Sequence, residues 1–519
     1  MKKSTDDFKK LIAHCKEYGY VFPSSEVYDG LSAVYDYGPY GVELKNNIKE
    51  YWWKAMVQMH ENIVGLDSAI FMHPSIWKAS GHVDAFSDPM IDNKDSKKRY
   101  RADVLIEDHL AKIDAKNDKD VAKAQKRFGD SFDEAQFRAT NGRVVKRQEE
   151  RDAIHQRFVE ALKSENLADL KTLIEDCKIA DPEGGSRNWT DVRQFNLMFS
   201  TQFGATSSEG GDNSNKVYLR PETAQGIFVN FLNVQKTTRQ KIPFGIAQIG
   251  KAFRNEIVAR QFIFRMREFE QMEMQYFVKP GTEMEWYHYW KEFRMNWHKS
   301  LFPDTKLQYH DHDKLAHYAN AALDIEFEFP FGFKEIEGIH SRTDFDLSNH
   351  QELSGRKLQY FDSEMGESYV PYVVETSIGV DRTFFAVVSH ALQEEEVPDA
   401  KGNMTTRVVM KIPAVLAPVK VAVLPLVKKE VIADKAREIF NQLKWVTQCQ
   451  YDEKDSVGRR YRRQDAIGTP FCVTVDFETL EDGQVTVRDR DTMEQVRIPI
   501  DAIEGHIAGK LDFRTLIKG

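Results

Sequence analysis

The fold of this chain is decided by residues 245–256, which read GIAQIGKAFRNE, and by residues 264–273, which read FRMREFEQME. β-Branched and aromatic residues interleaved with polar ones are typical of strands, so we expect strands over residues 245–253 and 262–278. Successive side chains of a strand point to opposite faces of its sheet. One face of the second strand should therefore carry Arg265, Arg267, Phe269, Gln271 and Glu273.

Such a face is chemically graded, with cations at one end, an aromatic ring in the middle and a carboxylate at the other end. Cations suit phosphates, a ring suits a stacked base and a carboxylate suits an amine, so the pattern indicates a nucleotide site. A solvent-facing charged hairpin is the plainer alternative. The position of Phe269 among the charges, together with the separate Arg254, favours the nucleotide site.

Two arginines far apart in the sequence extend this prediction. Arg254 is followed two residues later by Glu256, which together offer a guanidinium for a phosphate and a carboxylate for an exocyclic amine. Arg382 ends the junction SIGVDR at residues 377–382, where its planar cation suits a purine ring or a terminal phosphate. Together they indicate ATP bound on an antiparallel sheet.

The stretch from Gly245 to Ala252 also nearly matches the phosphate-loop pattern G-x-x-x-x-G-K-[ST]. Ala252 has no hydroxyl for magnesium, and Ile246 and Ile249 favour a strand over a loop that cradles phosphates. We therefore prefer the strand to the phosphate loop.

Composition describes a globular protein of several domains. The chain has 519 residues and a mass of 60.1 kDa, with 41% hydrophobic and 29% charged residues, which predicts two to four domains. Residues 1–20 contain no long apolar stretch, so we expect no signal peptide, no membrane partner and a cytoplasmic location. A net charge of -9 means that local basic patches must hold any nucleic acid.

The sequence predicts an α+β protein in four parts, which are residues 1–103, 104–185, 186–416 and 417–519. The first part contains an amphipathic helix over residues 44–59 and a strand-like run over residues 70–77. The second is rich in charged residues and reads as an inserted helical subdomain, with a partly disordered linker as the alternative. The third is the antiparallel sheet core, with strands at 216–219, 245–253, 262–278, 322–329 and 369–377 and a helix at 286–298. The last is a separate α/β domain, with strands at 419–426, 445–451, 471–475 and 485–488 and a helix at 431–443.

These segments resemble motifs 2 and 3 of the class II aminoacyl-tRNA synthetases. The stretches LRPETAQG at 219–226, FEQME at 269–273 and ETSIG at 375–379 are most similar to glycyl-tRNA synthetases of the homodimeric type. The resemblance covers nearly the whole chain. It implies a sheet core flanked by helices, an anticodon-binding domain at the end, and a reaction in which ATP activates glycine to glycyl-adenylate for transfer to the 3′ end of tRNA(Gly).

The resemblance assigns ATP-binding residues. Arg254 would stabilise the charge on the α-phosphate, Phe269 and Arg382 would sandwich adenine, and Arg254 and Arg382 would be the catalytic pair. Glu335 matches the carboxylate that binds ATP with Mg²⁺, with a plain surface acid as the alternative. The full implied ATP site comprises Arg254, Asn255, Glu256, Phe264, Arg265, Met266, Arg267, Glu268, Phe269, Glu335, Ile336, Gly379, Val380, Asp381 and Arg382.

The resemblance also assigns a glycine pocket. Glu222, Glu273 and Ser377 match amine-binding positions, and a small cavity walled by acids would leave no room for a β-methyl group. Arg101 matches a substrate-contacting arginine, with a surface salt bridge as the alternative. The full implied pocket comprises Arg101, Glu222, Phe269, Glu270, Gln271, Met272, Glu273, Glu375, Thr376, Ser377, Ile378 and Gly379.

Other implied features concern assembly, tRNA and metal. The helix over residues 44–59 resembles motif 1 and implies a homodimer, although an ordinary core helix fits its pattern equally well. The cluster Arg459, Arg460, Arg462 and Arg463 around Tyr461 would contact tRNA, unless it is a solvated face. The four cysteines form no C-x-x-C pair where relatives often carry them, so we expect no structural zinc.

Two other functions compete with this one. A synthetase-like accessory subunit would be expected to lose the phosphate arginines or the amine-binding acids. This chain retains all of these residues: Arg254, Glu256, Arg382, Glu222 and Glu273. A class II synthetase for another small amino acid is the second alternative, which the acid-lined pocket disfavours.

Overall fold

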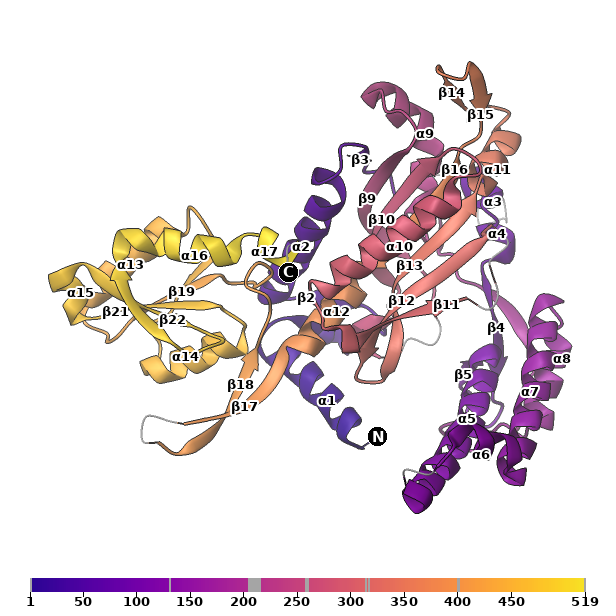
Figure 1. The fold of residues 1–519 in the computed structure, drawn as a ribbon, viewed down its shortest axis with the longest axis horizontal. Helices are drawn as coiled ribbons and strands as arrows, with labels where there is room; N and C mark the ends of the chain where they lie inside the picture. The colour runs from indigo at the N-terminus through magenta and orange to yellow at the C-terminus, as the bar shows by residue number, and fades with distance from the viewer. Residues whose placement is uncertain are drawn as a thin grey trace. The chain divides into compact units, whose positions relative to one another are not determined.

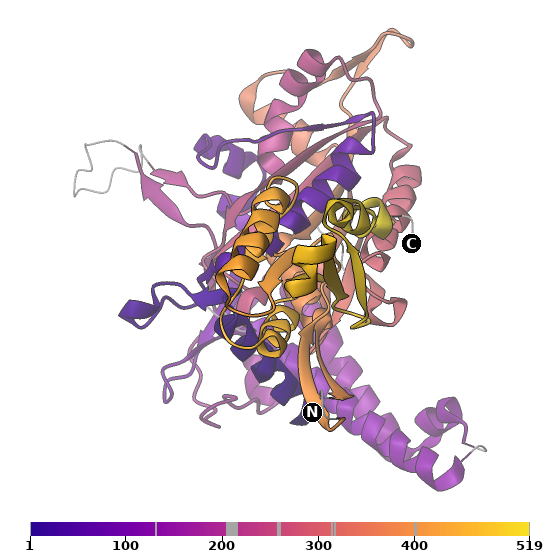
Figure 2. The same cartoon turned by 90° about the vertical axis from the view of Figure 1, so that its left-hand side faces the viewer.

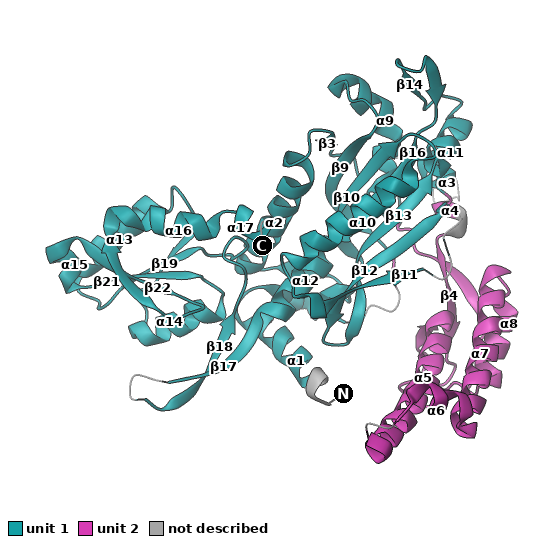
Figure 3. Ribbon diagram, viewed as in Figure 1, with its two compact units in different colours: residues 1–80, 200–254, 260–519 teal, residues 81–199, 255–259 magenta. Residues whose placement is uncertain are grey.

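The computed structural model describes residues 2–129, 132–203, 216–256, 261–312, 315, 318–398 and 402–517. The chain forms two compact units (Figure 3). Unit 1 contains residues 1–80, 200–254 and 260–519, and unit 2 contains residues 81–199 and 255–259. In the part of the chain that is described, no helix is both long and apolar enough to cross a bilayer.

The centre of unit 1 is a seven-stranded sheet (Figure 1). Its neighbouring strands are antiparallel except for the first two along the chain, β3 and β9, which are parallel. In spatial order the strands are β11 (Leu307–Asp311), β12 (Ala321–Phe329), β13 (Gly332–Thr343), β16 (Tyr372–Gly379), β10 (Glu268–Val278), β9 (Phe244–Phe253) and β3 (Ile63–Gly65). The predicted antiparallel core is confirmed, and residues 245–253 form a strand rather than a phosphate loop.

Helices cover both faces of this sheet. On one face the largest apolar cluster packs Met272, Met274 and Ile378 against α2 (Pro39–Trp53), α10 (Glu283–Lys299) and α12 (Val380–Ala391). On the other face α9 (Ala224–Thr238) packs over Ile246 and Phe277. Nearer the start of β10, the side chains on this second face are polar. This polar part of the face is where the sequence predicted ligand binding.

The segment before β10 differs from the prediction. Residues 262–267 do not extend the strand: Phe262–Phe264 form the 3₁₀ turn η5, and β10 begins at Glu268. Phe262 packs edge-on against Tyr35, and Phe264 packs against Phe329. Burial of these rings in the aromatic core outweighs the alternating pattern, so Arg265 and Arg267 do not share a strand face with Glu273.

The strand predicted over residues 70–77 is also wrong. Phe71 forms only an isolated bridge with Leu219, and Pro74–Ala79 form helix α3. Proline favours the first turn of a helix because its missing N–H needs no partner there. The side chain of His73 caps this helix by accepting from the Ser75 backbone N–H at 3.2 Å.

The start of the chain packs onto the same core. The elements are α1 (Lys2–Glu17), β1 (Val21–Pro23), η1 (Glu26–Tyr28), β2 (Tyr35–Tyr37), α2 and the π-helical turn η2 (Lys54–Gln58). Along α2 the apolar residues Leu44, Ile48 and Trp52 are fully buried within the chain itself. The amphipathic helix predicted here exists, and its apolar face belongs to the core of the chain itself. Two small hairpins, β7 (Ser200–Gln202) with β8 (Lys216–Tyr218) and β14 (Tyr360–Asp362) with β15 (Glu367–Tyr369), and the helix α11 (Phe345–Ser354) complete this region.

The last part of unit 1 is a five-stranded mixed sheet with helices, which Figure 2 turns toward the viewer in orange to yellow. Its strands, in spatial order, are β20 (Cys449–Tyr451), β19 (Val421–Pro425), β21 (Phe471–Val475), β22 (Gln484–Asp489) and β23 (Gln495–Pro499). Its helices are α13 (Glu430–Leu443), α14 (Val457–Ala466), α15 (Phe477–Asp482), α16 (Ile503–Leu511) and α17 (Arg514–Ile517). The hairpin β17 (Leu392–Pro398) and β18 (Met404–Met410) precedes it. The predicted α/β domain is confirmed.

Unit 2 is mostly helical. Its helices are α4 (His82–Ala85), α5 (Ala102–Phe128), α6 (Glu134–Thr140), α7 (Gly142–Lys163) and α8 (Leu167–Asp176), and β5 (Arg99–Arg101), β4 (Ser87–Asp92) and β6 (Arg193–Asn196) form a small sheet. Ile106, Phe158 and Leu173 share an apolar core. Between residues 104 and 185 the described residues are mostly helical, and the bounds of this segment stay a prediction.

Candidate active site

The register between β10 and β16 brings polar residues together on one sheet face. Glu273 lies opposite Ser377, and Gln275 lies opposite Glu375. Alternation places these four side chains on the same face, because residues two apart in a strand point the same way. Thr223, the N-cap residue directly before α9, donates its hydroxyl to Oε2 of Glu273. The start of α9 therefore closes one side of an acid-lined site.

Glu273 is the most deeply buried acid of the face, with 1% exposure. Its Oε1 accepts a hydrogen bond from Nε2 of Gln275 at 2.7 Å. Burial, together with the charges of Glu375 and Glu222, raises the pKa of Glu273 well above its usual range. A ligand that carries a positive charge would relieve this cost, so the site is suited to an ammonium group.

Glu375 has a different environment. Arg342 donates to its Oε2 at 3.0 Å, Gln275 donates to the same oxygen at 2.7 Å, and Nδ1 of His340 lies 2.9 Å from its Oε1. Burial alone would raise the pKa of Glu375, but Arg342 and His340 outweigh it and hold that pKa at about 2. Glu375 is therefore ionised, and its oxygens are occupied by protein donors.

A chain of hydrogen bonds links the acids to α9 and α11. Nε2 of Gln225 donates to Glu222 and to Asp346, each at 2.9 Å, and His350 lies 2.8 Å from Oε1 of Gln225. Asp346 in turn accepts from Arg342 at 2.8 and 3.0 Å. Glu222 and Glu375 are thus positioned through one buried network.

The expectation that all of residues 269–273 and 375–379 point their side chains into one pocket needs correction. Gln271 donates to Ser377 Oγ at 3.3 Å on the polar face. The side chain of Glu270 lies on the opposite face and pairs with Lys45 of α2 at 2.8 Å. The others on that opposite face are buried there: Met272, Thr376 and Ile378. The physical reason is the pleat, which sends alternate residues to opposite sides.

The two predicted catalytic arginines lie at the other end of the face. The Arg382 Nη1 is 2.9 Å from Oε2 of Glu335, and its guanidinium carbon lies 4.4 Å from the centre of the Phe264 ring. Arg254 donates from Nε to the Pro221 carbonyl at 3.1 Å and lies 5.2 Å from the centre of the Phe269 ring. Each arginine is therefore paired with its own aromatic ring.

Glu335 is half-exposed between these groups. The part of this side chain that is shielded from water would raise its pKa, but the Arg382 and Arg254 guanidinium groups outweigh this effect and lower the pKa. An ionised carboxylate between two cations is an arrangement that suits a phosphate with a divalent cation.

Other residues of the predicted ATP site serve the fold. Asp381 is buried and accepts from Lys45 at 2.7 Å, from the Glu270 backbone N–H at 2.8 Å and from the Tyr37 hydroxyl. The side chains of three others belong to the apolar core: Met266, Ile336 and Val380. These four are corrected as direct side-chain contacts, because their side chains already have partners. Arg267 donates to the Ser32 carbonyl at 3.0 Å, and Glu268 pairs with Lys251 at 2.5 Å.

Three predicted residues belong to unit 2. Arg101 pairs there with Asp103 at 2.6 Å and with Asp88 at 3.2 Å. The Asn255 backbone N–H donates to the Leu197 carbonyl at 2.8 Å, and Glu256 follows it. Their roles toward glycine and ATP stay predictions.

Sequence reasoning missed several members of the site, above all Gln275, His340, Arg342 and Asp346. Gln275 continues the alternation of Gln271 and Glu273 by one more step, so the pattern could have found it. Thr223 and Gln225 lie inside the stretch at 219–226 that was singled out. No local signal marks Arg342, whose role depends on a partner on another strand.

The basic cluster of the last domain is divided by burial. Arg460 is 2% exposed and donates to the carbonyls of Pro425, Asp452 and Leu426 at 2.6, 3.2 and 3.3 Å. This burial contradicts the prediction that Arg460 contacts tRNA, because its guanidinium is occupied inside the domain. Arg463 pairs with Asp452 and Asp455, while Arg459 is exposed.

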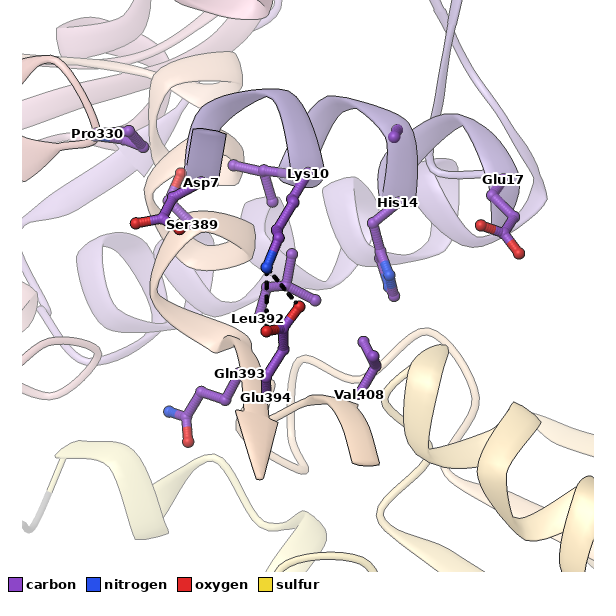
Figure 4. A pocket seen from close by; sticks show the side chains of 12 residues that line it. Asp7, Lys10, His14, Glu17, Pro330, Ser389, Leu392, Gln393, Glu394 and Val408 are labelled. Atoms are coloured by element: carbon purple, nitrogen blue, oxygen red, sulfur yellow. Dashed lines mark hydrogen bonds and ion pairs between the residues drawn. The ribbon is translucent and has the colours of Figure 1, made fainter. Parts of the chain in front are cut away.

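A separate cavity of ≈520 Å³ lies between α1 and the β17–β18 hairpin (Figure 4). Lys10 spans it and pairs with Glu394 at 2.9 Å. None of its lining residues was predicted to bind glycine or ATP. It forms no part of the site described above.

An antiparallel sheet with a polar ligand face, and an α/β domain after it, is the architecture of the class II aminoacyl-tRNA synthetases. Family models agree: residues 206–391 match the "tRNA synthetase class II core domain (G, H, P, S and T)", and residues 420–510 match the "Anticodon binding domain". Residues 88–197 match the "Glycyl-tRNA synthetase insertion domain 1".

Whole-chain relatives narrow the class. The glycine–tRNA ligase of Chlorobaculum tepidum is 51% identical over 97% of this chain and 99% of its own length. Those of Staphylococcus saprophyticus and Geobacillus thermodenitrificans are 48% and 49% identical, over 98% and 97% of this chain and 100% and 98% of theirs. The chain belongs to the glycine–tRNA ligase family.

Proposed function

We propose that this chain activates glycine with ATP and transfers it to tRNA(Gly), using the polar face of β10 and β16. The observation that carries the proposal is the pair Glu273 and Ser377, which lie opposite each other in the sheet register beside the first turn of α9. Glycine offers only an ammonium and a carboxylate. The ammonium is held by Glu273, Glu222 and Ser377, and it lowers the raised pKa of Glu273 on binding.

In the first step an oxygen of the glycine carboxylate attacks the α-phosphorus of ATP. A new P–O bond joins the glycine carboxylate to the α-phosphorus. The bond from the α-phosphorus to the oxygen that bridges to the β-phosphorus breaks, and pyrophosphate leaves with the electron pair. Arg254 stabilises the negative charge that develops at the α-phosphorus, and Arg382 holds the nucleotide. Losing one such fixed donor typically costs about 100- to 1,000-fold in rate.

The residues at this end of the face fit a nucleotide with Mg²⁺. Glu335 supplies an ionised oxygen ligand of the kind that Mg²⁺ prefers, flanked by Arg382 and Arg254 for phosphate oxygens. When bound, the ion would neutralise phosphate charge. The ring of Phe269, beside Arg254, and the guanidinium plane of Arg382 offer surfaces for adenine.

The pocket selects glycine by exclusion. The acids and the Thr223 hydroxyl lie together on this face, and around a bound glycine they would leave no room for a β-carbon. Recognising one extra methylene by attraction contributes only about 1–3 kcal/mol, whereas a clash can reject larger amino acids outright. Selection by steric exclusion therefore needs no second site that hydrolyses wrongly charged products.

In the second step a terminal ribose hydroxyl of tRNA attacks the adenylate carbonyl, forms the ester and releases AMP. Positioning carries this step, and no side-chain nucleophile is needed. The last domain holds the tRNA through cations of α14, chiefly the exposed Arg459, with the half-buried Arg462 on the same helix.

We also propose a cytoplasmic homodimer, and we keep the four-part division at residues 103, 185 and 416. The dimer rests only on the resemblance of residues 44–59 to motif 1. The apolar face of α2 gives no separate support, because that face is already buried within one chain. Sedimentation analysis tests it: a mass near twice 60.1 kDa is expected, and a monomer at micromolar concentration would refute it.

ATP–pyrophosphate exchange tests the catalytic proposal. Exchange should depend on glycine and be absent with alanine, serine or threonine. Arg254→Ala should lose about 100- to 1,000-fold in exchange, whereas Arg239→Ala, at the exposed end of α9, should retain it. Exchange with none of the amino acids would instead favour an accessory subunit, and exchange with another one would favour a different synthetase.

A further inference from the structure

Three side chains with metal-binding atoms meet on adjacent strands of unit 1. His312 directly follows β11, Asp324 lies on β12 and His340 lies on β13. One ligand atom from each lies within 4.8 Å of the other two. Nε2 of His312 is 2.9 Å from Oδ2 of Asp324. In the described part of the chain, these three residues form the group of histidines, cysteines and acids whose ligand atoms lie close enough together to hold an ion.

The ring of His340 is oriented for such a role. Its Nδ1 lies 2.9 Å from Oε1 of Glu375, so the Nδ1–H donates to this carboxylate and the lone pair stays on Nε2. Histidines that bind metals nearly always donate their other ring nitrogen to a carboxylate or carbonyl. Glu375 therefore supplies the supporting contact that a metal-binding histidine needs.

Gly338 leaves open the space in front of this nitrogen. A Cβ at Gly338 would lie 3.2 Å from Nε2 of His340 and 3.6 Å from Oδ1 of Asp324. Nε2 of His340 and Oδ1 of Asp324 therefore converge over Gly338, which has no side chain. Any other residue at 338 would crowd the point where the atoms meet.

We infer that His312, Asp324 and His340 bind a divalent transition-metal ion of the Zn²⁺ type. Two imidazoles and one carboxylate suit zinc, cobalt or nickel, whereas Mg²⁺ and Ca²⁺ prefer oxygen ligands alone. Tetrahedral bonds of about 2.0–2.2 Å place ligand atoms about 3.3–3.6 Å apart, a separation that small rotations of these side chains supply. Three protein ligands leave one position for water or for a group of a bound ligand.

Two imidazoles distinguish this set from the nucleotide carboxylate Glu335 in ligand chemistry, and the set reaches the glycine pocket through the contact of His340 with Glu375. With a metal on Nε2, His340 keeps its proton on Nδ1 and donates to Glu375. Glu375 then accepts from His340 and Arg342 together, which keeps its oxygens turned away from the ammonium site. The absence of cysteine pairs, from which the sequence predicted no structural zinc, does not bear on this cysteine-free set.

Metal titration of the full chain tests the inference directly. The chain is stripped with a chelator and titrated with Zn²⁺ by calorimetry, and with Co²⁺ by visible absorption, without ATP. One ion per chain is expected, with tetrahedral Co²⁺ bands and no thiolate-to-metal band. His312→Gln and Asp324→Asn should each weaken binding at least about tenfold.

The matched control is His288→Gln, which removes an exposed histidine of α10 and should leave the affinity unchanged. Thermal melting establishes that each variant is folded; if Asp324→Asn is not, His312→Gln carries the test, because its side chain is 29% exposed. Equal weakening by His288→Gln, unchanged binding in His312→Gln, a thiolate band, or no binding by the unaltered chain would each overturn the inference.

Discussion

The guanidinium of Arg342 lies 3.0 Å from Oε2 of Glu375, and both side chains are only 5% exposed. This pair compensates one of the acids that face the pocket and leaves Glu222 and Glu273 to meet an ammonium group. The pocket therefore holds a graded set of charges rather than equivalent acids.

Removing the cation of this pair should destabilise the fold. Arg342→Met leaves Glu375 and Asp346 buried without their partner, so the free energy of unfolding should fall by about 3–5 kcal/mol. The double variant Arg342→Met/Glu375→Gln should recover part of this loss. Denaturant unfolding measures both, and a double variant no more stable than the single one would contradict the compensation.

The two faces of β10 should differ in their effect on glycine. Glu273→Gln removes the ammonium partner and should lower kcat/KM for glycine by roughly 10- to 150-fold, since hydrogen bonds to charged groups contribute about 1.5–3 kcal/mol. Glu270→Gln, on the same strand but paired with Lys45, should change the KM for glycine much less. Similar losses in both variants would show that the face assignment is wrong.

Glycine binding should become tighter as pH rises. In the free chain, burial and the nearby acids raise the pKa of Glu273 above its ordinary 4.5, and a bound ammonium lowers it again, so binding releases a proton. The affinity for glycine should rise with pH up to the pKa that Glu273 has in the free chain and then level off. Calorimetry in two buffers of different ionisation enthalpy counts the proton, and Glu273→Gln should abolish the dependence.

Arg459 and Arg460 are neighbours with opposite roles. Arg460→Ala leaves three backbone carbonyls without their donor, one of them in a fully buried hydrogen bond, and should destabilise the last domain by about 2–4 kcal/mol, seen as a lower Tm. Arg459→Ala should leave Tm unchanged, raise the KM for tRNA and reduce the salt slope of binding by about one. A stable Arg460→Ala variant with weakened tRNA binding would reverse this assignment.

Lys420 predicts a specific dependence of stability on pH. Burial lowers its pKa to about 7, although its ammonium donates to the Ala417 carbonyl at 2.8 Å. Above pH 7 the folded chain loses this proton while the unfolded chain keeps it up to about pH 10.4, so stability rises with pH. From pH 7 to 9 the gain should be about 2 kcal/mol relative to Lys420→Met, measured by unfolding at each pH. Parallel pH profiles for the two proteins would contradict it.

Much of the sheet could be predicted because its information is local. The strands over residues 245–253 and 471–475 and the helix near residues 286–298 follow from patterns within about 15 residues. The same local pattern failed over residues 262–267, where Phe262 and Phe264 turn into an aromatic core built from distant segments. Rings that can be buried by remote partners override alternation.

The sequence by itself determined which residue types stand at the site: Glu222, Glu273, Arg254 and Arg382 lie in short motifs whose chemistry can be read directly. Only the tertiary structure decided their partners. It paired Arg382 with Phe264, neutralised Glu375 with Arg342 and buried Arg460 beneath backbone carbonyls. The reason is physical: burial and ion pairing depend on residues brought together from separate strands and helices, and a linear pattern carries no record of those distances.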